Sequence, residues 1–222
     1  IRGVLRKGVC KAGEIAAIGI TNQRETALLW DRETGEALNN AVVWQCRRTT
    51  DFCETLKSRG LEKTVRRKAG LVLDPYFSAS KFRWLLRNTP GIRRKLDAGR
   101  VAAGTVDSYL VWQLTGGERH VTDVSNAART SLMNLKRLAW DSELAELFEV
   151  PLQLLPEIVP TSGILGHTRG VRGLPDGIPI AGMAGDQQAA LFGQACFGVG
   201  DAKCTFGTGS FIVMNTGDEL LH

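Results

Sequence analysis

Hydrophobic residues in this chain fall into short runs that end at glycine or at clusters of polar residues. The clearest run begins at Ile178 and stops at two glycines, Gly182 and Gly185, after which the apolar residues follow a helical spacing. Short apolar runs bounded by turn residues predict buried strands, and a period near 3.6 predicts a helix. Residues 178–192 are therefore predicted to be a strand that passes directly into a helix, with Asp186 at the junction.

The same two patterns alternate along the rest of the chain and predict an α/β protein. Strands are predicted at residues 14–21, 27–30, 41–44, 100–104, 202–206 and 211–215. Helices are predicted at residues 50–59, 61–68 and 108–114, with two more that are capped by Ser80 and Asp141. The first three strands are expected to form a meander, and the glycine-rich residues 161–177 are expected to be a loop.

Composition is that of an ordinary globular protein. The chain has 222 residues, of which 43% are hydrophobic and 23% are charged, enough for one large domain or slightly more. No apolar run reaches the roughly 18 residues that a membrane span needs, and no secretory signal is visible. The five cysteines show no paired spacing, so we expect reduced thiols in a cytoplasmic protein. Neither end of the chain coincides with a turn, and we expect a part of a longer protein.

Charge and reactive residue types exclude several functions. The net charge of +5 comes from basic residues scattered over probable helices beside acidic neighbours, which is typical of solvated helix faces. No basic and aromatic platform accompanies them, so we expect no nucleic-acid partner. A mildly positive field would suit an anionic substrate. The three histidines are too far apart for a zinc site, and the G-x-S-x-G motif of serine hydrolases is absent.

The sequence position of Asp186 fits two roles, a ligand-binding residue or a helix N-cap. Ligands of open α/β sheets bind beyond the carboxyl ends of strands, and a helix start adds backbone N–H donors. The same position also suits a helix N-cap, whose carboxylate accepts hydrogen bonds from the first turn. Asp123, which precedes another short helical segment, is predicted to be a cap or a loop anchor. The residues alone leave both readings of Asp186 open.

Polar residues also follow the first predicted strand. Arg24 and Glu25 are adjacent, so in a regular strand they would point to opposite faces. They could form a surface salt bridge, or they could hold a polyhydroxylated ligand, because Arg offers donors and Glu offers acceptors. Tyr76 follows a proline in a loop, and its hydroxyl could face a cleft or make a structural hydrogen bond.

A third candidate lies between the last two predicted strands. Gly207, Thr208 and Gly209 would form the tip of a hairpin that exposes main-chain N–H groups and a hydroxyl. Such a tip is a plausible cradle for phosphate. An ordinary hairpin turn explains the same residues equally well.

Seven ordered segments, taken together, resemble the FGGY family of carbohydrate kinases and, within it, the glycerol kinase branch. They are GITNQRET (19–26), VVWQCRRT (42–49), GLVLDPYFSASK (70–81), GTVDSYLVWQLTGG (104–117), HVTDVSNAARTSL (120–132), AGDQQAALFGQ (184–194) and FGTGSF (206–211). NQRET together with VWQCRR is similar to the glycerol branch rather than to the xylulose or gluconate kinases. The Gly-Arg loop by which some bacterial relatives bind fructose 1,6-bisphosphate does not match residues 168–175 cleanly.

The resemblance implies an α/β protein with the ribonuclease H-like fold of the actin-like ATPases, in which helices flank a mixed sheet. Residues 1–193 would form the polyol-binding domain, without its first hairpin. Residues 194–222 would begin a partial second domain that binds ATP. The resemblance further implies glycerol and ATP as ligands, Mg²⁺ as a cofactor held mostly outside this chain, and a homo-oligomer in the full-length protein.

The resemblance also assigns roles to particular residues. Glycerol would be held by Arg24, Glu25, Trp44, Tyr76, Asp186, Gln187 and Phe211. The ATP phosphates would face Gly207, Thr208 and Gly209, and no metal ligand is implied within the chain. Asp186 would act as the general base that removes a proton from the attacking hydroxyl.

Three other readings stay open beside an ATP-dependent glycerol kinase. They are a kinase for another sugar or polyol of the same family, a non-catalytic actin-like binding protein, and a ribonuclease H-like nuclease. The nuclease would need carboxylates clustered around two metal ions, and the spacing of Asp107, Asp123 and Asp186 does not indicate such a cluster. On the glycerol kinase reading we expect little or no kinase activity from these 222 residues alone.

Overall fold

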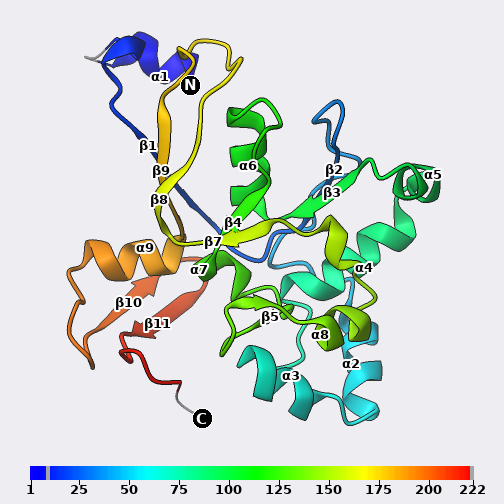
Figure 1. Ribbon diagram of the computed structural model, residues 1–222. Helices are drawn as coiled ribbons and strands as arrows, with labels where there is room; N and C mark the ends of the chain where they lie inside the picture. The colour runs from blue at the N-terminus through cyan, green and yellow to red at the C-terminus, as the bar shows by residue number, and fades with distance from the viewer. Residues whose placement is uncertain (9–10, 221–222) are drawn as a thin grey trace.

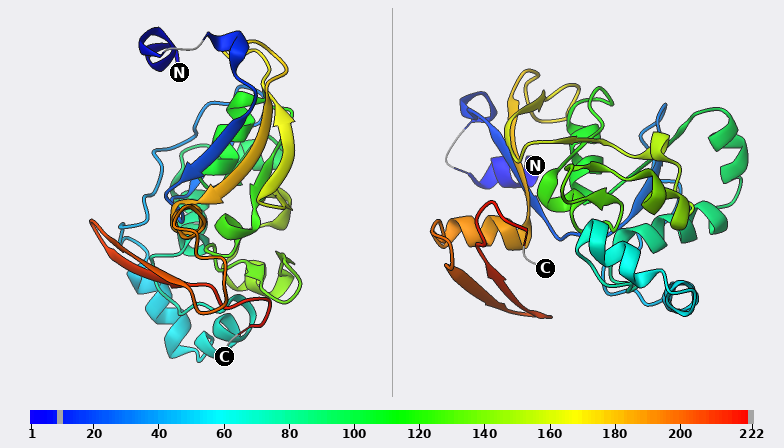
Figure 2. Two further views of the ribbon diagram at one scale, coloured as in Figure 1. Left: turned by 90° about the vertical axis from the view of Figure 1, so that its left-hand side faces the viewer. Right: turned by 60° about the horizontal axis from the view of Figure 1, so that its bottom comes forward.

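A computed structural model of the chain describes residues 1–8 and 11–220 and shows helices packed around short sheets (Figure 1). The central sheet has three strands in the order β1 (Ile18–Asn22), β9 (Pro179–Gly185) and β8 (Ser162–His167). β1 runs parallel to β9, whereas β8 runs antiparallel to it, so the sheet is mixed. Figure 2 shows the three strands side by side.

Four two-stranded sheets complete the β structure of the described residues. They pair β2 (Leu28–Asp31) with β3 (Val101–Gly104), β4 (Val121–Asp123) with β7 (Glu157–Val159), β5 (Met133–Asn134) with β6 (Ala139–Trp140), and β10 (Ala202–Phe206) with β11 (Ser210–Met214). The last pair is an antiparallel hairpin that packs against α9 (Asp186–Gly193). This hairpin and α1 (Arg2–Lys7) lie at opposite ends of the central strands (Figure 1).

The remaining helices flank these sheets. They are α2 (Thr50–Ser58), α3 (Glu62–Ala69), α4 (Ser78–Asn88), α5 (Ile92–Asp97), α6 (Val106–Leu114), α7 (Val124–Ala127) and α8 (Ser142–Leu147), with single 3-10 turns at Ala12–Glu14 and Leu152–Leu154. α3 ends at Gly70, whose φ of 67° suits glycine. No helix within the described ranges is both long and apolar enough to cross a bilayer.

Two apolar cores bear on the position of the candidate site, and a third, small cluster of Trp30, Ala102 and Trp112 also lies within the described residues. The larger core packs helices α2 to α5 and α8 against β2 and β3, with Leu29 and Phe82 almost fully buried. The smaller core packs α6 against the central sheet through Val111, Ile180 and Met183. Each such side chain contributes on the order of 1.5–3 kcal/mol by leaving water. The second core therefore fixes the strand, β9, that leads into Asp186.

Several local predictions agree with the structure. The strands at 100–104 and 202–206 and the helix at 108–114 are present with ends shifted by two residues or fewer. Asp123 and Asp141 are N-caps whose carboxylates accept main-chain hydrogen bonds from α7 and α8. Four cysteines, Cys46, Cys53, Cys196 and Cys204, are free thiols, and Cys10 lies outside the described residues.

Other predictions were wrong where partners are distant in sequence. The opening strands do not form a meander, because β1 pairs with β9 and β2 pairs with β3. Residues 41–44 are not a strand: a single bridge joins Val42 to Ala27. Residues 162–167 form an edge strand rather than a loop, with an irregular register between Ser162 and Gly166. Ser80 does not cap α4: the helix begins at Ser78 with Phe77 as its N-cap, and the Ser80 hydroxyl shares a hydrogen bond of 2.8 Å with Thr49 Oγ1.

Candidate active site

A tight turn follows β1 and carries the first two candidate residues. The Thr26 amide donates a hydrogen bond to the Arg24 carbonyl at 2.8 Å, and Glu25 between them has a φ of 63°. An i to i+2 hydrogen bond around a residue with positive φ is a rare, strained γ-turn. The turn breaks the alternation of a strand, so Arg24 and Glu25 are both buried on the same side of the chain rather than on opposite faces. A surface salt bridge between them is thereby ruled out.

Arg24 reaches three carboxylate or amide groups. Its Nε lies 3.3 Å from Asp186 Oδ1 and 4.0 Å from Glu25 Oε1, and its Nη1 donates to Gln188 Oε1 at 3.3 Å. The Nε atom is buried, yet its geometry makes no hydrogen bond with any described residue. Its ion pair with Asp186 leaves this N–H without a hydrogen bond, and a buried donor in that state is suited to a ligand hydroxyl.

Asp186 lies where β9 meets α9. Gly185 is the N-cap and Asp186 is the first helical residue, so the N-cap reading of Asp186 is wrong. Its carboxylate is 44% exposed and accepts a hydrogen bond from the Gln187 amide at 2.8 Å. The carboxylate is therefore held at the helix start while it stays accessible to a ligand.

Glycine at position 185 makes room for the Arg24 side chain. A Cβ at Gly185 would lie 2.5 Å from Arg24 Cδ and 2.7 Å from Arg24 Cγ. The Gly185 amide donates to the Ser125 hydroxyl at 2.8 Å, and that hydroxyl donates to Asp123 at 2.6 Å. The fully buried Asp123 thus anchors the strand–helix junction through Ser125.

The carboxylate of Glu25 is held by an arginine from another part of the chain. Arg129 Nε donates to Glu25 Oε1 at 2.7 Å. The second oxygen of Glu25 accepts no hydrogen bond from the residues that the structure describes. This oxygen is therefore free to accept a hydrogen bond from a ligand.

Three aromatic rings continue the cluster. Trp44 packs edge to face against Tyr76 with centroids 5.7 Å apart, and against Phe211 at 6.4 Å. The Arg129 guanidinium lies 5.6 Å from the centre of the Tyr76 ring. Burial, and then the nearby charge of Glu25, raises the pKa of Tyr76 above its usual value. Its hydroxyl therefore stays protonated near neutral pH and can act as a donor.

The hairpin is tied to α9 by a lysine. The buried Lys203 ammonium donates to the side-chain oxygen of Gln187 and to Thr205 Oγ1 at 2.6 Å. The tip itself, at Gly207 and Thr208, is exposed. A Cβ at Gly209 would lie 2.9 Å from the Phe211 ring, so glycine lets the tip fold onto that ring.

Side-chain contacts thus connect all seven residues expected to bind glycerol. The order of contact is Gln187, Asp186, Arg24, Glu25, Arg129, Tyr76, Trp44 and Phe211. These residues come from segments at 24–25, 44, 76, 129, 186–187 and 211. The tip residues Gly207, Thr208 and Gly209 are joined to the cluster through Phe211.

The sequence of this chain is similar to those of known carbohydrate kinases. The model of the N-terminal domain of the FGGY family of carbohydrate kinases matches residues 1–193. The chain belongs to this family. A glycerol kinase from Bdellovibrio bacteriovorus is 58% identical over 221 residues, which cover 100% of this chain and 45% of that protein. This FGGY chain thus spans less than half the length of such relatives.

Solved structures agree with the family assignment. The crystal structure of Plasmodium falciparum glycerol kinase with ADP matches at a TM-score of 0.85 and 40% identity, covering 91% of this chain and 40% of that chain. Gluconate kinase from Lactobacillus acidophilus matches at a TM-score of 0.80 and 24% identity, covering 95% and 42%. This second likeness concerns the fold alone. The FGGY chain therefore has the predicted ribonuclease H-like, actin-like α/β fold with a mixed sheet.

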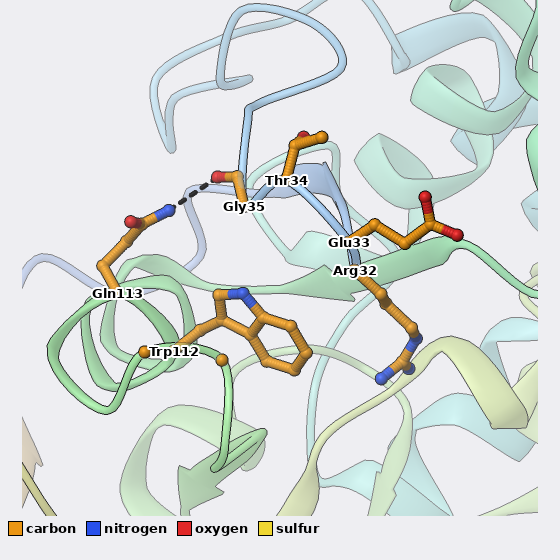
Figure 3. A pocket seen from close by; sticks show the side chains of 8 residues that line it. Arg32, Glu33, Thr34, Gly35, Trp112 and Gln113 are labelled. Atoms are coloured by element: carbon orange, nitrogen blue, oxygen red, sulfur yellow. Dashed lines mark hydrogen bonds between the residues drawn. The ribbon is translucent and has the colours of Figure 1, made fainter. Parts of the chain in front are cut away.

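A hollow of this FGGY chain lies away from the cluster. It has a volume of about 210 Å³ and is lined by Arg32, Glu33, Thr34, Gly35, Trp112, Gln113, Gly116 and Gly117 (Figure 3). The Gln113 amide donates to the Gly35 carbonyl at 2.6 Å, and the Arg32 guanidinium lies 5.9 Å from the centre of the Trp112 ring. Its lining includes none of the predicted site residues.

Sequence reasoning missed three residues of the cluster: Lys81, Arg129 and Lys203. Lys81 is fully buried, and desolvation lowers its pKa to about 8 although the Glu25 charge opposes this. Lys81 and Arg129 fall inside two of the segments that carry the family resemblance, which was an available signal. Lys203 stands in an ordinary strand pattern, and nothing local marks it.

Proposed function

We propose that the intact protein containing this chain transfers the γ-phosphoryl group of ATP to glycerol. The observation that carries the proposal is the unused hydrogen-bonding capacity of the buried cluster, at Arg24 Nε and at the second oxygen of Glu25. A triol offers a donor and an acceptor at every hydroxyl and would satisfy both groups. The glycerol kinases among the relatives support the same substrate.

The residues suggest how each part of glycerol is held. Arg24 and Glu25 would bind one terminal hydroxyl, and Tyr76 with Asp186 would bind the middle one. Asp186 and Gln187 would bind the hydroxyl that attacks. The rings of Trp44 and Phe211 would pack against the carbon chain, because glycerol carbons are apolar. Pairing every hydroxyl would discriminate strongly against analogues that lack one.

Asp186 is the proposed general base. Its exposed carboxylate lies at the start of α9, where it can accept the proton of the attacking hydroxyl while Arg24 stays within 3.3 Å. Positioning and charge stabilisation dominate phosphoryl transfer, so a fixed hydroxyl beside a base accounts for most of what this chain contributes.

The hairpin tip suits the phosphates of ATP. A Cβ at Gly207 would meet only the Gly209 carbonyl at 3.9 Å within the described residues, so the main chain there is open to close approach. When bound, ATP supplies the phosphoryl group and Mg²⁺ neutralises its charge. The described residues include no group of three or more His, Cys, Asp or Glu side chains placed to hold a metal. We expect Mg²⁺ to be held mainly by other parts of the intact protein.

Further expectations go with this activity. Residues 1–193 would form the polyol-binding domain, and residues 194–222 would begin the ATP-binding domain. We expect the intact protein to be a cytoplasmic homo-oligomer, and we expect the 222 residues alone to have little or no kinase activity.

Calorimetry and coupled kinetic assays on the intact protein test the proposal. Glycerol should bind and be phosphorylated with ATP at a kcat/KM at least about 100-fold above those for xylulose and gluconate, since the cluster pairs three hydroxyls of a small triol. Phosphorylation of xylulose or gluconate in preference to glycerol would contradict the substrate. Binding of glycerol without turnover would contradict the activity.

A further inference from the structure

The γ-turn at Glu25 needs support from outside itself. Glu25 adopts a φ of 63°, a region that residues other than glycine rarely occupy. Such strained backbone persists only where the surrounding structure holds it. The groups that hold this turn therefore decide whether the Glu25 carboxylate faces a ligand.

Two side chains from the first turn of α4 hold the main chain of Glu25. Lys81 Nζ donates to the Glu25 carbonyl at 3.1 Å and also to the Tyr76 carbonyl, and Ser78 Oγ donates to the Glu25 carbonyl at 3.2 Å. Lys81 and Ser78 are fully buried. A buried ammonium is costly unless its donors are used, and here they join two loops that each carry a candidate ligand residue.

Arg129 holds the side chains of the same two residues. Its Nε donates to the Glu25 carboxylate at 2.7 Å, and its guanidinium lies over the Tyr76 ring at 5.6 Å. Arg129 is 25% exposed and follows Glu25 by 104 residues, so this contact depends on the tertiary fold. The fixed fork of an arginine orients a carboxylate better than a single ammonium can.

We propose that Lys81 and Arg129 are positioning residues of the polyol site. Lys81 fixes the main chain of Glu25 and Tyr76, whereas Arg129 fixes their side chains. The inference rests on the proposed glycerol kinase activity and adds two residues that make no contact with substrate in that proposal. Because hydrogen bonds weaken steeply when they are misaligned, a shift of Glu25 or Tyr76 should weaken glycerol binding and leave ATP binding unchanged.

Kinetics of the intact protein test the role of Arg129. Arg129→Met should raise the KM for glycerol by about 10- to 100-fold while the KM for ATP stays within twofold, because only the polyol contacts move. Arg129→Lys should recover part of the loss, since it keeps the charge but not the fork. The matched control is Arg100→Met. Arg100 is 33% exposed and pairs with another buried carboxylate, that of Asp31. This control should lower Tm without changing the KM for glycerol.

Lys81→Met tests the main-chain contact, and Ser78→Ala is the milder variant if Lys81→Met does not fold. Either should raise the KM for glycerol and speed hydrogen exchange of the Thr26 amide, which closes the γ-turn. The exchange rate does not depend on the substrate, so it tests Lys81 even if glycerol is the wrong polyol. Unchanged exchange in Ser78→Ala and Lys81→Met would overturn the role of Lys81.

The outcomes separate the two proposals. If the unmodified protein neither binds nor phosphorylates glycerol, the proposed function fails, and the variants are then compared with the polyol that the protein does use. If the unmodified protein phosphorylates glycerol and Arg129→Met leaves the KM for glycerol within twofold, the positioning role of Arg129 fails and the function stands. If Arg129→Met raised the KM for glycerol only as much as Arg100→Met does, the positioning role of Arg129 would also be overturned. The change in KM would then reflect lost stability alone.

Discussion

Two buried carboxylates of this chain are each held by basic side chains, but they differ in how completely they are satisfied. Asp31 accepts hydrogen bonds at both oxygens, from the Glu33 amide, Lys95 and Arg100. Glu25 accepts one from Arg129 at a single oxygen. Both carboxylates are 2% exposed or less, so burial does not distinguish them.

The difference separates a structural ion cluster from the proposed binding site. The hydrogen bond from Lys95, followed by those from the Glu33 amide and Arg100, outweighs desolvation and holds the pKa of Asp31 well below its usual range. Both oxygens of Asp31 thus have hydrogen-bond donors among the described residues. Around Glu25, by contrast, a carboxylate oxygen and the Arg24 Nε atom are unused. Incomplete hydrogen bonding thus distinguishes Glu25 from Asp31, although it is not confined to the cluster: Trp30 Nε1, Arg83 Nε and Ser108 Oγ are also buried without hydrogen bonds among the described residues.

The largest effect should come from the carboxylate that the site leaves accessible. Asp186→Ala in the intact protein should lower kcat for glycerol by about 1,000-fold or more, because the proposed base is removed. The control Asp97→Ala removes a carboxylate that is 63% exposed on α5 and should leave kcat unchanged. Steady-state kinetics check both variants, and near-normal kcat in Asp186→Ala would refute the assignment of the base.

The next effect should be on stability alone. Asp31→Ala leaves Lys95 and Arg100 without their buried partner and should destabilise the protein by about 3 kcal/mol. Urea unfolding measures this loss. The KM for glycerol should not change, because none of the groups that bind Asp31 belongs to the site cluster. A large rise in KM would remove the distinction between the two carboxylates.

A smaller effect is expected from crowding Arg24. In Gly185→Ala the new Cβ would approach Arg24 Cδ to 2.5 Å, so the arginine must move away from Asp186. Glycerol affinity should fall by about 10-fold, or ~1.4 kcal/mol, as measured by calorimetry. Gly193→Ala is the matched control, since a Cβ there meets nothing within 4 Å among the described residues. Equal affinities in the two variants would contradict the need for glycine at position 185.

The smallest effect should appear in acid. Because the folded-state pKa of Asp31 is lowered, its contribution to stability is present above the unfolded value, near 4, and is lost as the pH falls toward the folded value. Tm should therefore drop more steeply below about pH 4 in the unmodified protein than in Asp31→Asn. Parallel curves from thermal unfolding at several pH values would show that Asp31 is not stabilised by its partners.

The local sequence pattern was enough to predict the helices α2, α3 and α6 and the β10–β11 hairpin. Their main-chain hydrogen bonds join residues of one continuous segment. The pattern was also enough for the caps at Asp123 and Asp141, whose partners lie two or three residues away. The strand–helix junction at Asp186 was visible for the same reason. Whether Asp186 is the N-cap was not visible, since that depends on the residue at which the helix begins, and the structure makes Gly185 the N-cap.

Only the tertiary structure decided which strands pair and which charges meet. The pairing of β1 with β9 joins residues about 160 positions apart, and Arg129 reaches Glu25 across 104 positions. The γ-turn at Glu25 is disfavoured locally and exists because Lys81, Ser78 and Arg129 hold it from distant segments. Sequence determined the segments and their chemical types, because propensity and periodicity act over a few residues. The cluster was decided by packing, because an unfavourable local conformation can be stabilised only by contacts that the chain makes after it has folded.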